Sequence, residues 1–149
     1  MGTIVRTDER SSSLILRVIL GIVMFPHGAA KALGWFGGHG FAATMNSFTS
    51  QMHIPAVFAF LAIAAEFCGS LGLMAGFLTR VAAFGILCNM VVAIWMVHWR
   101  NGFFMNWFGK QAGEGFEYHL LVIAICLALM LTGAGKWSVD RKLTAGEKG

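Results

Sequence analysis

Charged side chains are scarce in this sequence of 149 residues. Only 12% of the residues are Asp, Glu, Lys or Arg, whereas 57% are hydrophobic, and the mean hydropathy is +0.70. Soluble domains contain about a quarter charged residues, so water does not solvate most of the surface of this protein. The eleven basic residues form no patch, and the net charge of +4 therefore does not indicate a nucleic-acid-binding protein.

Sequence signatures of disulfide and metal chemistry are missing as well. The three cysteines, Cys68, Cys88 and Cys126, lie in separate apolar segments and form no C-x-x-C pair. We interpret them as small buried hydrophobic residues, since free cysteine is commonly buried. The histidines and glutamates show neither an E-x-x-H nor an H-E-x-x-H spacing, so no metal site is predicted.

Long apolar segments are present instead. A helix needs about 20 residues to cross the hydrocarbon core of a bilayer. Four segments reach or approach this length, namely residues 14–33, 55–77, 81–97 and 118–132. The sequence therefore predicts an all-α, polytopic four-helix bundle in a lipid bilayer. We expect its transmembrane domain to span 14–132, between an N-terminal segment, 1–13, and a disordered tail, 133–149.

The distribution of basic residues predicts the orientation in the membrane. Lysine and arginine are more frequent on the cytoplasmic side. With the N-terminus inside, eight basic residues lie inside or near that face, and only Lys31, Arg100 and Lys110 lie outside. We therefore expect both termini to be cytoplasmic. The outer loops then carry many aromatic residues, which form either an interfacial belt or a lid over a site.

Ionisable residues within the predicted spans are the first candidates for a site. On a helix, Arg17, His27 and Lys31 share one face of the first span, and such a face cannot point at lipid. Glu66 lies in the middle of the second span, on a stripe of small residues that includes a G-x-x-x-G pair at 72–76. An unpaired carboxylate at that depth is costly, so we expect one of the three basic residues to pair with it. Such a pair either only fixes helix register or belongs to a binding site.

Other polar residues near the ends of the spans are secondary candidates. We expect Asn89 to form a hydrogen bond across helices and His98 to belong to the outer loop. Glu117 and His119 point in roughly opposite directions on the fourth span, so at most one of them faces the bundle centre. Pro26 lacks a backbone donor and is expected to loosen the first span.

Taken in order, several segments resemble the DoxX family of small four-helix inner-membrane proteins. They are LRVILGIVMFPHGAAKALGWFGG, AEFCGSLGLMAGFLTRVAA, VHWRNGFFMNWFGKQAGEGFEYHLLV and LTGAGKWSVDR, which together cover about residues 14–141. The resemblance implies a multi-pass protein of a bacterial inner (plasma) membrane. The polar positions of the family correspond in this sequence to His27, Lys31, Glu66, Arg80, Glu117 and His119.

Relatives in this family are associated with thiosulfate:quinone oxidoreductase and with other membrane-bound sulfur or thiol redox assemblies. The resemblance thus implies a redox-associated subunit with an outward-facing pocket for a quinone or a small sulfur species. His27, Lys31 and Glu66 would line this pocket, and a soluble or membrane redox partner, or further copies of the chain, would complete it. A non-enzymatic scaffold that docks a soluble partner and a small oligomeric transporter stay open, because no residue pattern identifies a catalytic group.

Overall fold

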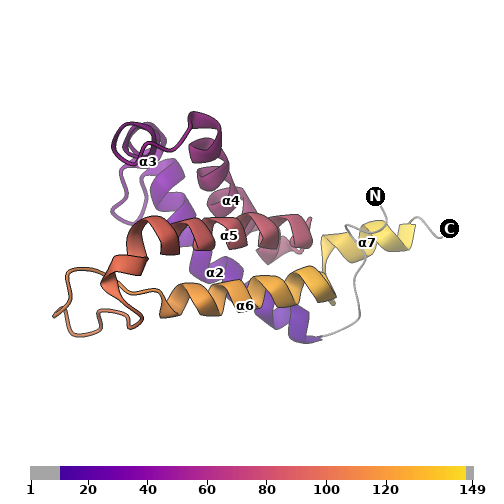
Figure 1. Ribbon diagram of the computed structural model, residues 1–149. Coiled ribbons are helices and arrows are strands. Elements are labelled where there is room, and N and C mark those ends of the chain that lie inside the picture. The colour runs from indigo at the N-terminus through magenta and orange to yellow at the C-terminus, as the bar shows by residue number, and fades with distance from the viewer. Residues whose placement is uncertain (1–10, 147–149) are drawn as a thin grey trace.

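The computed structural model describes residues 11–146, and no strand occurs among them (Figure 1). The all-α prediction is therefore confirmed for this part of the chain, whereas most of the predicted segment 1–13 and the last three residues lie outside it. The long helices are α2 (Ser11–Leu33), α4 (Ala56–Ala75), α5 (Thr79–Ala93) and α6 (Glu117–Thr132). The shorter elements are α3 (Gly40–Asn46), α7 (Val139–Gly146), two π-helical turns (Ser47–Gln51 and Ile94–His98) and a 3₁₀ turn (Trp99–Asn101).

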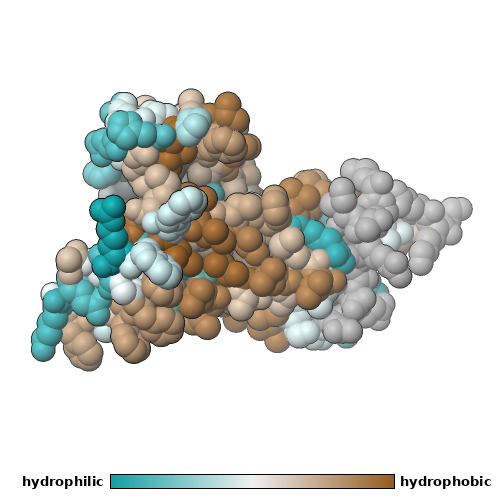
Figure 2. Space-filling model, viewed as in Figure 1, coloured by the Kyte–Doolittle hydropathy of each residue, from teal (hydrophilic) through white to brown (hydrophobic). Residues whose placement is uncertain are grey.

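Three helical segments are long and apolar enough to cross a membrane. They are α2, α4 and the segment Thr79–Asn101, which consists of α5 and the turns that extend it. Helix α6 is also apolar but has 16 residues. It is therefore about 24 Å long, somewhat less than the hydrocarbon core of about 30 Å. On the face drawn in Figure 2, hydrophobic residues cover the middle and hydrophilic residues gather near α3 and the loop before α6. These properties indicate a membrane protein.

The long helices pack in chain order, α2 against α4, α4 against α5 and α5 against α6, and α2 also contacts α6 (Figure 1). Their shared core consists of apolar side chains from all four helices, among them Leu20, Met24, Leu73, Ile86 and Leu129.

Both described ends of the chain lie at the same end of the bundle. The Ser13 hydroxyl at the start of α2 donates a hydrogen bond to Oγ1 of Thr132 at the end of α6, at 2.9 Å. The turn between α4 and α5 contacts the segment that contains α7. We call this the α7 end. The opposite end, formed by α3 and by residues 102–116, is called the loop end.

Two glycines on α2 allow this helix to lie very close to α4. A Cβ atom added to Gly28 would lie 2.6 Å from the backbone of Phe67, and one added to Gly21 would lie 2.9 Å from a carbonyl oxygen of α4. Small residues permit such contacts between membrane helices. The sequence predicted that Gly72 and Gly76 permit the close approach of two helices. Gly76, however, has a φ of 67° and ends α4 as a left-handed cap.

Pro26 does not break α2. The helix is continuous from Ser11 to Leu33 with the proline inside it. The expected loosening of the first span therefore does not interrupt the helix. The proline still removes the N–H group that would bond to the carbonyl of Ile22.

The segment after α6 is ordered by tertiary contacts, and the prediction of a disordered tail is wrong for its described residues. Asp140 is buried, and its carboxylate accepts hydrogen bonds from the backbone N–H groups of Leu78 and Thr79, at 2.7 and 3.0 Å. These N–H groups belong to the start of α5, where helical partners are lacking. The polar composition showed no sign of this contact, because the partners lie about sixty residues earlier in the sequence.

Arg17 is buried at the α7 end, with 1% of its surface exposed. Of the three basic residues predicted as possible partners of Glu66, Arg17 is not the one that pairs with it, because within residues 11–146 its guanidinium donates to backbone carbonyls, at 2.6 to 3.3 Å. These carbonyls belong to Leu73, Met74, Ala134, Lys136 and Trp137. The last carbonyls of a helix have no partner within it, so Arg17 satisfies the end of α4 and ties it to the segment after α6.

Replacing Asp140 with alanine should loosen the α7 end, because it removes the acceptor for two N–H groups of α5. Loss of a side chain that caps a helix N-terminus costs about 0.5–2 kcal/mol. We expect a lower melting temperature in detergent and faster amide hydrogen exchange in residues 139–146. Lys142→Ala, at an exposed position of the same helix, is the control. Unchanged exchange in Asp140→Ala would contradict the capping role.

Candidate functional site

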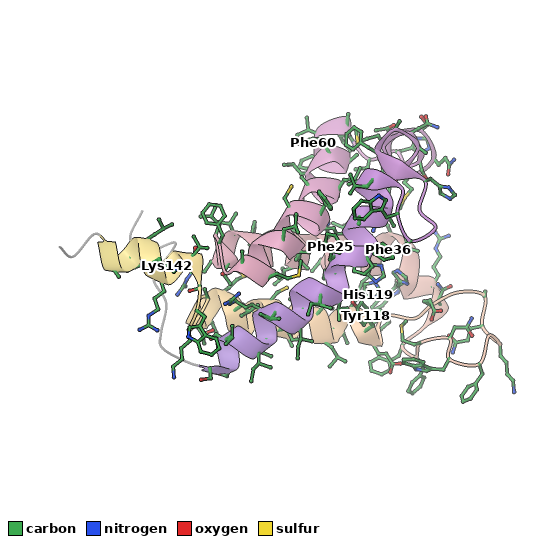
Figure 3. The ribbon with its side chains drawn as sticks, turned by 180° about the vertical axis from the view of Figure 1, so that it is seen from behind. Phe25, Phe36, Phe60, Tyr118, His119 and Lys142 are labelled. Carbon is green, nitrogen blue, oxygen red and sulfur yellow. The ribbon has the colours of Figure 1, made fainter. Side chains whose placement is uncertain are left out.

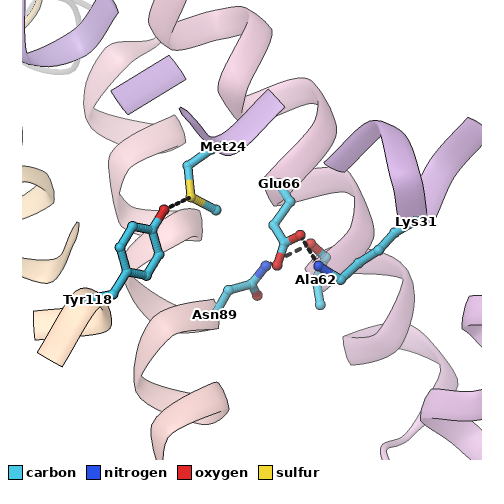
Figure 4. A network of polar contacts seen from close by, with 6 residues as sticks. All are labelled: Met24, Lys31, Ala62, Glu66, Asn89 and Tyr118. Carbon is cyan, nitrogen blue, oxygen red and sulfur yellow. Dashed lines mark hydrogen bonds and ion pairs between the residues drawn. The ribbon is translucent and has the colours of Figure 1, made fainter. Parts of the chain in front are cut away.

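An ion pair lies between α2 and α4. Nζ of Lys31, near the end of α2, donates to Oε2 of Glu66 in the middle of α4 (Figure 4). The side chains are 29% and 10% exposed, respectively. The sequence predicted a basic partner for Glu66, and the structure identifies it as Lys31. Gly28, one turn before Lys31, lies against the backbone of Glu66, so the close packing of the two helices brings the ammonium to the carboxylate.

The other two long helices add polar groups around this pair (Figure 4). Nδ2 of Asn89 on α5 donates to the carbonyl of Ala62 on α4 at 2.7 Å, which confirms the predicted bond across helices. The Tyr118 hydroxyl on α6 donates to Sδ of Met24 on α2 at 3.7 Å. We call Lys31, Glu66, Asn89 and Tyr118 the polar layer.

His27 does not join the ion pair. Its side chain is exposed, although it lies within electrostatic reach of His119. The prediction that His27 shares the buried face of α2 is wrong, because that face follows Arg17, Gly21, Met24 and Gly28. Position 27 lies about 100° around the helix from position 28, which is enough to turn it out of the interface.

Two histidine rings lie close to each other at the loop end. The rings of His98, from the turn that extends α5, and His119, from the first turn of α6, have centroids 4.1 Å apart and planes tilted by 42°. His119 is 7% exposed, and its Nδ1 atom is buried without a hydrogen-bond partner among the described residues. Nδ1 of His98 lies 2.8 Å from the carbonyl oxygen of Glu114 in the outer loop. Figure 3 shows His119 beside Tyr118 at the start of α6.

Glu117 organises the outer loop and does not face the bundle centre. Its Oε1 atom accepts hydrogen bonds from the backbone N–H of Met105 at 2.9 Å and from Nε1 of Trp107 at 3.3 Å. Of Glu117 and His119, only His119 is buried, in agreement with the opposite directions predicted for them. The aromatic side chains of Phe104, Trp107 and Phe108 are largely exposed, which is typical of an interfacial belt rather than a closed lid.

Arg80 is a structural residue of the α7 end. Its Nη1 and Nη2 atoms donate to the carbonyls of Met130 and Leu131, at 2.5 and 3.2 Å. These carbonyls lie in the last turn of α6, so Arg80 joins α5 to α6 and is not part of the polar layer.

The cysteines do not form a site. Cys126 is buried, as expected, but Cys68 and Cys88 are exposed. The interpretation as buried residues is wrong for these two, because they lie on faces of α4 and α5 that no helix within residues 11–146 covers. Within residues 11–146, no group of three or more His, Cys, Asp and Glu side chains has a geometry that could hold a metal ion.

Replacing Glu66 with alanine should destabilise the bundle, because it leaves the ammonium of Lys31 without its partner. Breaking a buried ion pair costs about 3–5 kcal/mol. We expect a loss of stability near the lower limit of this range, since the partly exposed Lys31 side chain can extend towards water. Thermal unfolding in detergent measures the effect, with Glu114→Ala at the exposed loop as the control. A melting temperature equal to that of the wild type would show that the pair does not stabilise the bundle.

Comparisons with known proteins agree with the resemblance found in the sequence. The model of the DoxX family matches residues 12–99, which include the ion pair and all of α4 and α5. A protein of Bacillus subtilis (strain 168) named "Putative oxidoreductase CatD" is 31% identical over 136 residues, 91% of this chain and 90% of its own length. No solved structure matches the chain. The protein therefore belongs to the DoxX family.

Proposed function

We propose that this protein is a redox-associated subunit of the bacterial inner membrane that binds a quinone or a small sulfur species beside the polar layer. The observation that carries the proposal is the ion pair of Lys31 and Glu66 inside an apolar helix bundle. Ionisable residues within membrane spans usually belong to substrate, ion or proton pathways. Family membership and the oxidoreductase name of the Bacillus subtilis relative support the same reading.

The chemistry of the polar layer suits such a ligand. A quinone needs apolar walls and one or two groups that exchange protons with its oxygen atoms. Lys31 supplies a donor and Glu66 an acceptor. The aromatic rings of Phe25 on α2 and Phe67 on α4, with centroids 6.0 Å apart, would supply apolar walls on the same two helices. Because the Lys31 side chain is partly exposed, the proposed ligand would enter beside it from the loop end.

A non-enzymatic scaffold is the second candidate. It is favoured by the fact that Lys31 and Glu66 satisfy each other, as expected for a pair that only fixes how two helices pack. In that case the aromatic residues of the loop end would dock a soluble partner.

Complementation distinguishes the two functions. In a deletion strain with a redox-stress or sulfur-metabolism phenotype, Lys31→Ala and Glu66→Gln should abolish rescue while protein levels in the membrane stay normal. Glu66→Gln keeps the size of the side chain and one acceptor oxygen, but it removes the charge and replaces the other oxygen with an N–H donor. His53→Ala, at an exposed position, should rescue fully. Full rescue by both site variants would favour the scaffold.

We further propose that α6 is a fourth span and that both termini are cytoplasmic. Five basic residues of the described part lie at the α7 end, and three lie at the loop end. Those at the α7 end are Arg17, Arg80, Lys136, Arg141 and Lys142. This bias is the one expected for the cytoplasmic side, and a helix of 16 residues can cross where the bilayer thins locally.

A fluorescent-protein fusion at the C-terminus tests this orientation. It should fluoresce, because the green fluorescent protein folds in the cytoplasm, whereas an alkaline phosphatase fusion at the same position should be inactive. A second pair of fusions within residues 106–111 of the loop end should give the opposite result. Phosphatase activity at the C-terminus would show that α6 does not cross or that the bundle is inverted.

A further inference from the structure

We infer that His119 is the residue that binds an oxygen atom of the ligand, and that this ligand is a quinone rather than a sulfur oxyanion. The inference rests on the proposed redox function and adds the contacting group and the ligand class. It places the hydrogen bond to the ligand at the loop end, on α6, whereas the ion pair joins α2 and α4.

His119 has an unused hydrogen-bonding atom in an apolar interior. Nearly all buried polar atoms of native proteins have a partner, and an exception calls for an explanation such as a bound molecule. Nδ1 of His119 is such an exception among the described residues. The hydroxyl of Thr79 is also buried without a partner in this part of the chain, but it lies at the α7 end.

The neighbouring polar groups are already engaged. Lys31 and Glu66 bind each other, Asn89 binds the carbonyl of Ala62, and the Tyr118 hydroxyl contacts Met24. A ligand that bound any of them would first have to replace an existing contact. A ligand that bound His119 would satisfy an atom that has no partner among residues 11–146.

His98 holds the ring of His119 in a defined environment. The carbonyl of Glu114 can only accept, so Nδ1 of His98 is the donor in that 2.8 Å contact. This bond fixes the orientation of the His98 ring, which lies beside the His119 ring with the two planes tilted by 42°. Tyr118 lies edge-on to His119, with ring centroids 5.7 Å apart. A flat, conjugated ring such as that of a quinone matches these surroundings.

The properties of imidazole favour a quinone. A neutral imidazole carries one N–H donor and one acceptor nitrogen, and these can exchange. Nδ1 can therefore donate to a quinone carbonyl or accept from a quinol hydroxyl, so one atom serves both redox states. An oxyanion such as thiosulfate would need cationic partners, and the cation of the polar layer, Lys31, is neutralised by Glu66.

Binding of decylubiquinone to the purified full chain in detergent tests the inference. His119→Phe keeps a ring but removes the nitrogen atoms, and its dissociation constant should rise about tenfold, the effect of losing one good hydrogen bond. His119→Gln retains a donor and an acceptor and should stay within about threefold of the wild type. His39→Phe, at an exposed position, is the matched control and should bind normally.

The infrared spectrum of the bound quinone gives a readout that a purely structural role would not change. A hydrogen bond lowers the carbonyl stretching frequency, so the wild type and His119→Gln should show a shifted band that is lost in His119→Phe. If His119→Phe does not fold, the wild type labelled with ¹⁵N-histidine provides the test. The Nδ1 resonance of His119 should then move when decylubiquinone is added, and an unmoved resonance would overturn the inference.

The outcomes separate this inference from the proposed function. Unchanged affinity and carbonyl band in His119→Phe, combined with weaker binding in Lys31→Ala, would overturn the role of His119 and leave the redox function standing. Binding of thiosulfate but not decylubiquinone would overturn the assignment of the ligand as a quinone. Binding of neither, together with full rescue by Lys31→Ala and Glu66→Gln, would overturn both.

Discussion

The contact between α2 and α4 at Gly28 determines much of the remaining structure. A Cβ atom at this position would lie 2.6 Å from the backbone of Phe67, so only glycine lets the two helices approach this closely. The approach places Lys31, one turn later on α2, beside Glu66 on α4. A carboxylate within an apolar bundle needs such a partner, because an unpaired charge in this environment is costly. The packing of small residues and the electrostatics of the site are therefore parts of one arrangement.

At the α7 end, the same principle acts on backbone groups. Helix ends leave N–H and C=O groups without partners, and groups that are buried inside the protein cannot bind water instead. Arg17 and Arg80 donate to carbonyls at the ends of α4 and α6, and Asp140 accepts from the start of α5. Charged residues at this end thus serve the fold. At the loop end, by contrast, His119 carries a buried nitrogen without a partner among the described residues, and this is the end proposed to bind a ligand.

The candidate site was only partly visible in the sequence. The burial of Glu66 and the need for a basic partner followed from its position in an apolar segment, and the bond of Asn89 across helices followed in the same way. His27 was placed wrongly, because a rotation of about 100° between adjacent residues separates a buried from an exposed position. The unsatisfied nitrogen of His119 had no signal in the sequence, since it depends on what surrounds the ring after α5 and α6 have packed.

The sequence by itself determined the helical class, the approximate bounds of the apolar helices and the family. These features follow from composition and from local periodicity, which do not depend on distant partners. Only the tertiary structure decided that Lys31 rather than Arg17 binds Glu66, and that the polar segment after α6 folds into α7 against the start of α5. The contacts of Asp140 with Leu78 and Thr79 join residues about sixty positions apart. The physical reason is that a hydrogen bond between distant residues depends on how the helices are placed in space. The local sequence around each partner does not predict that placement.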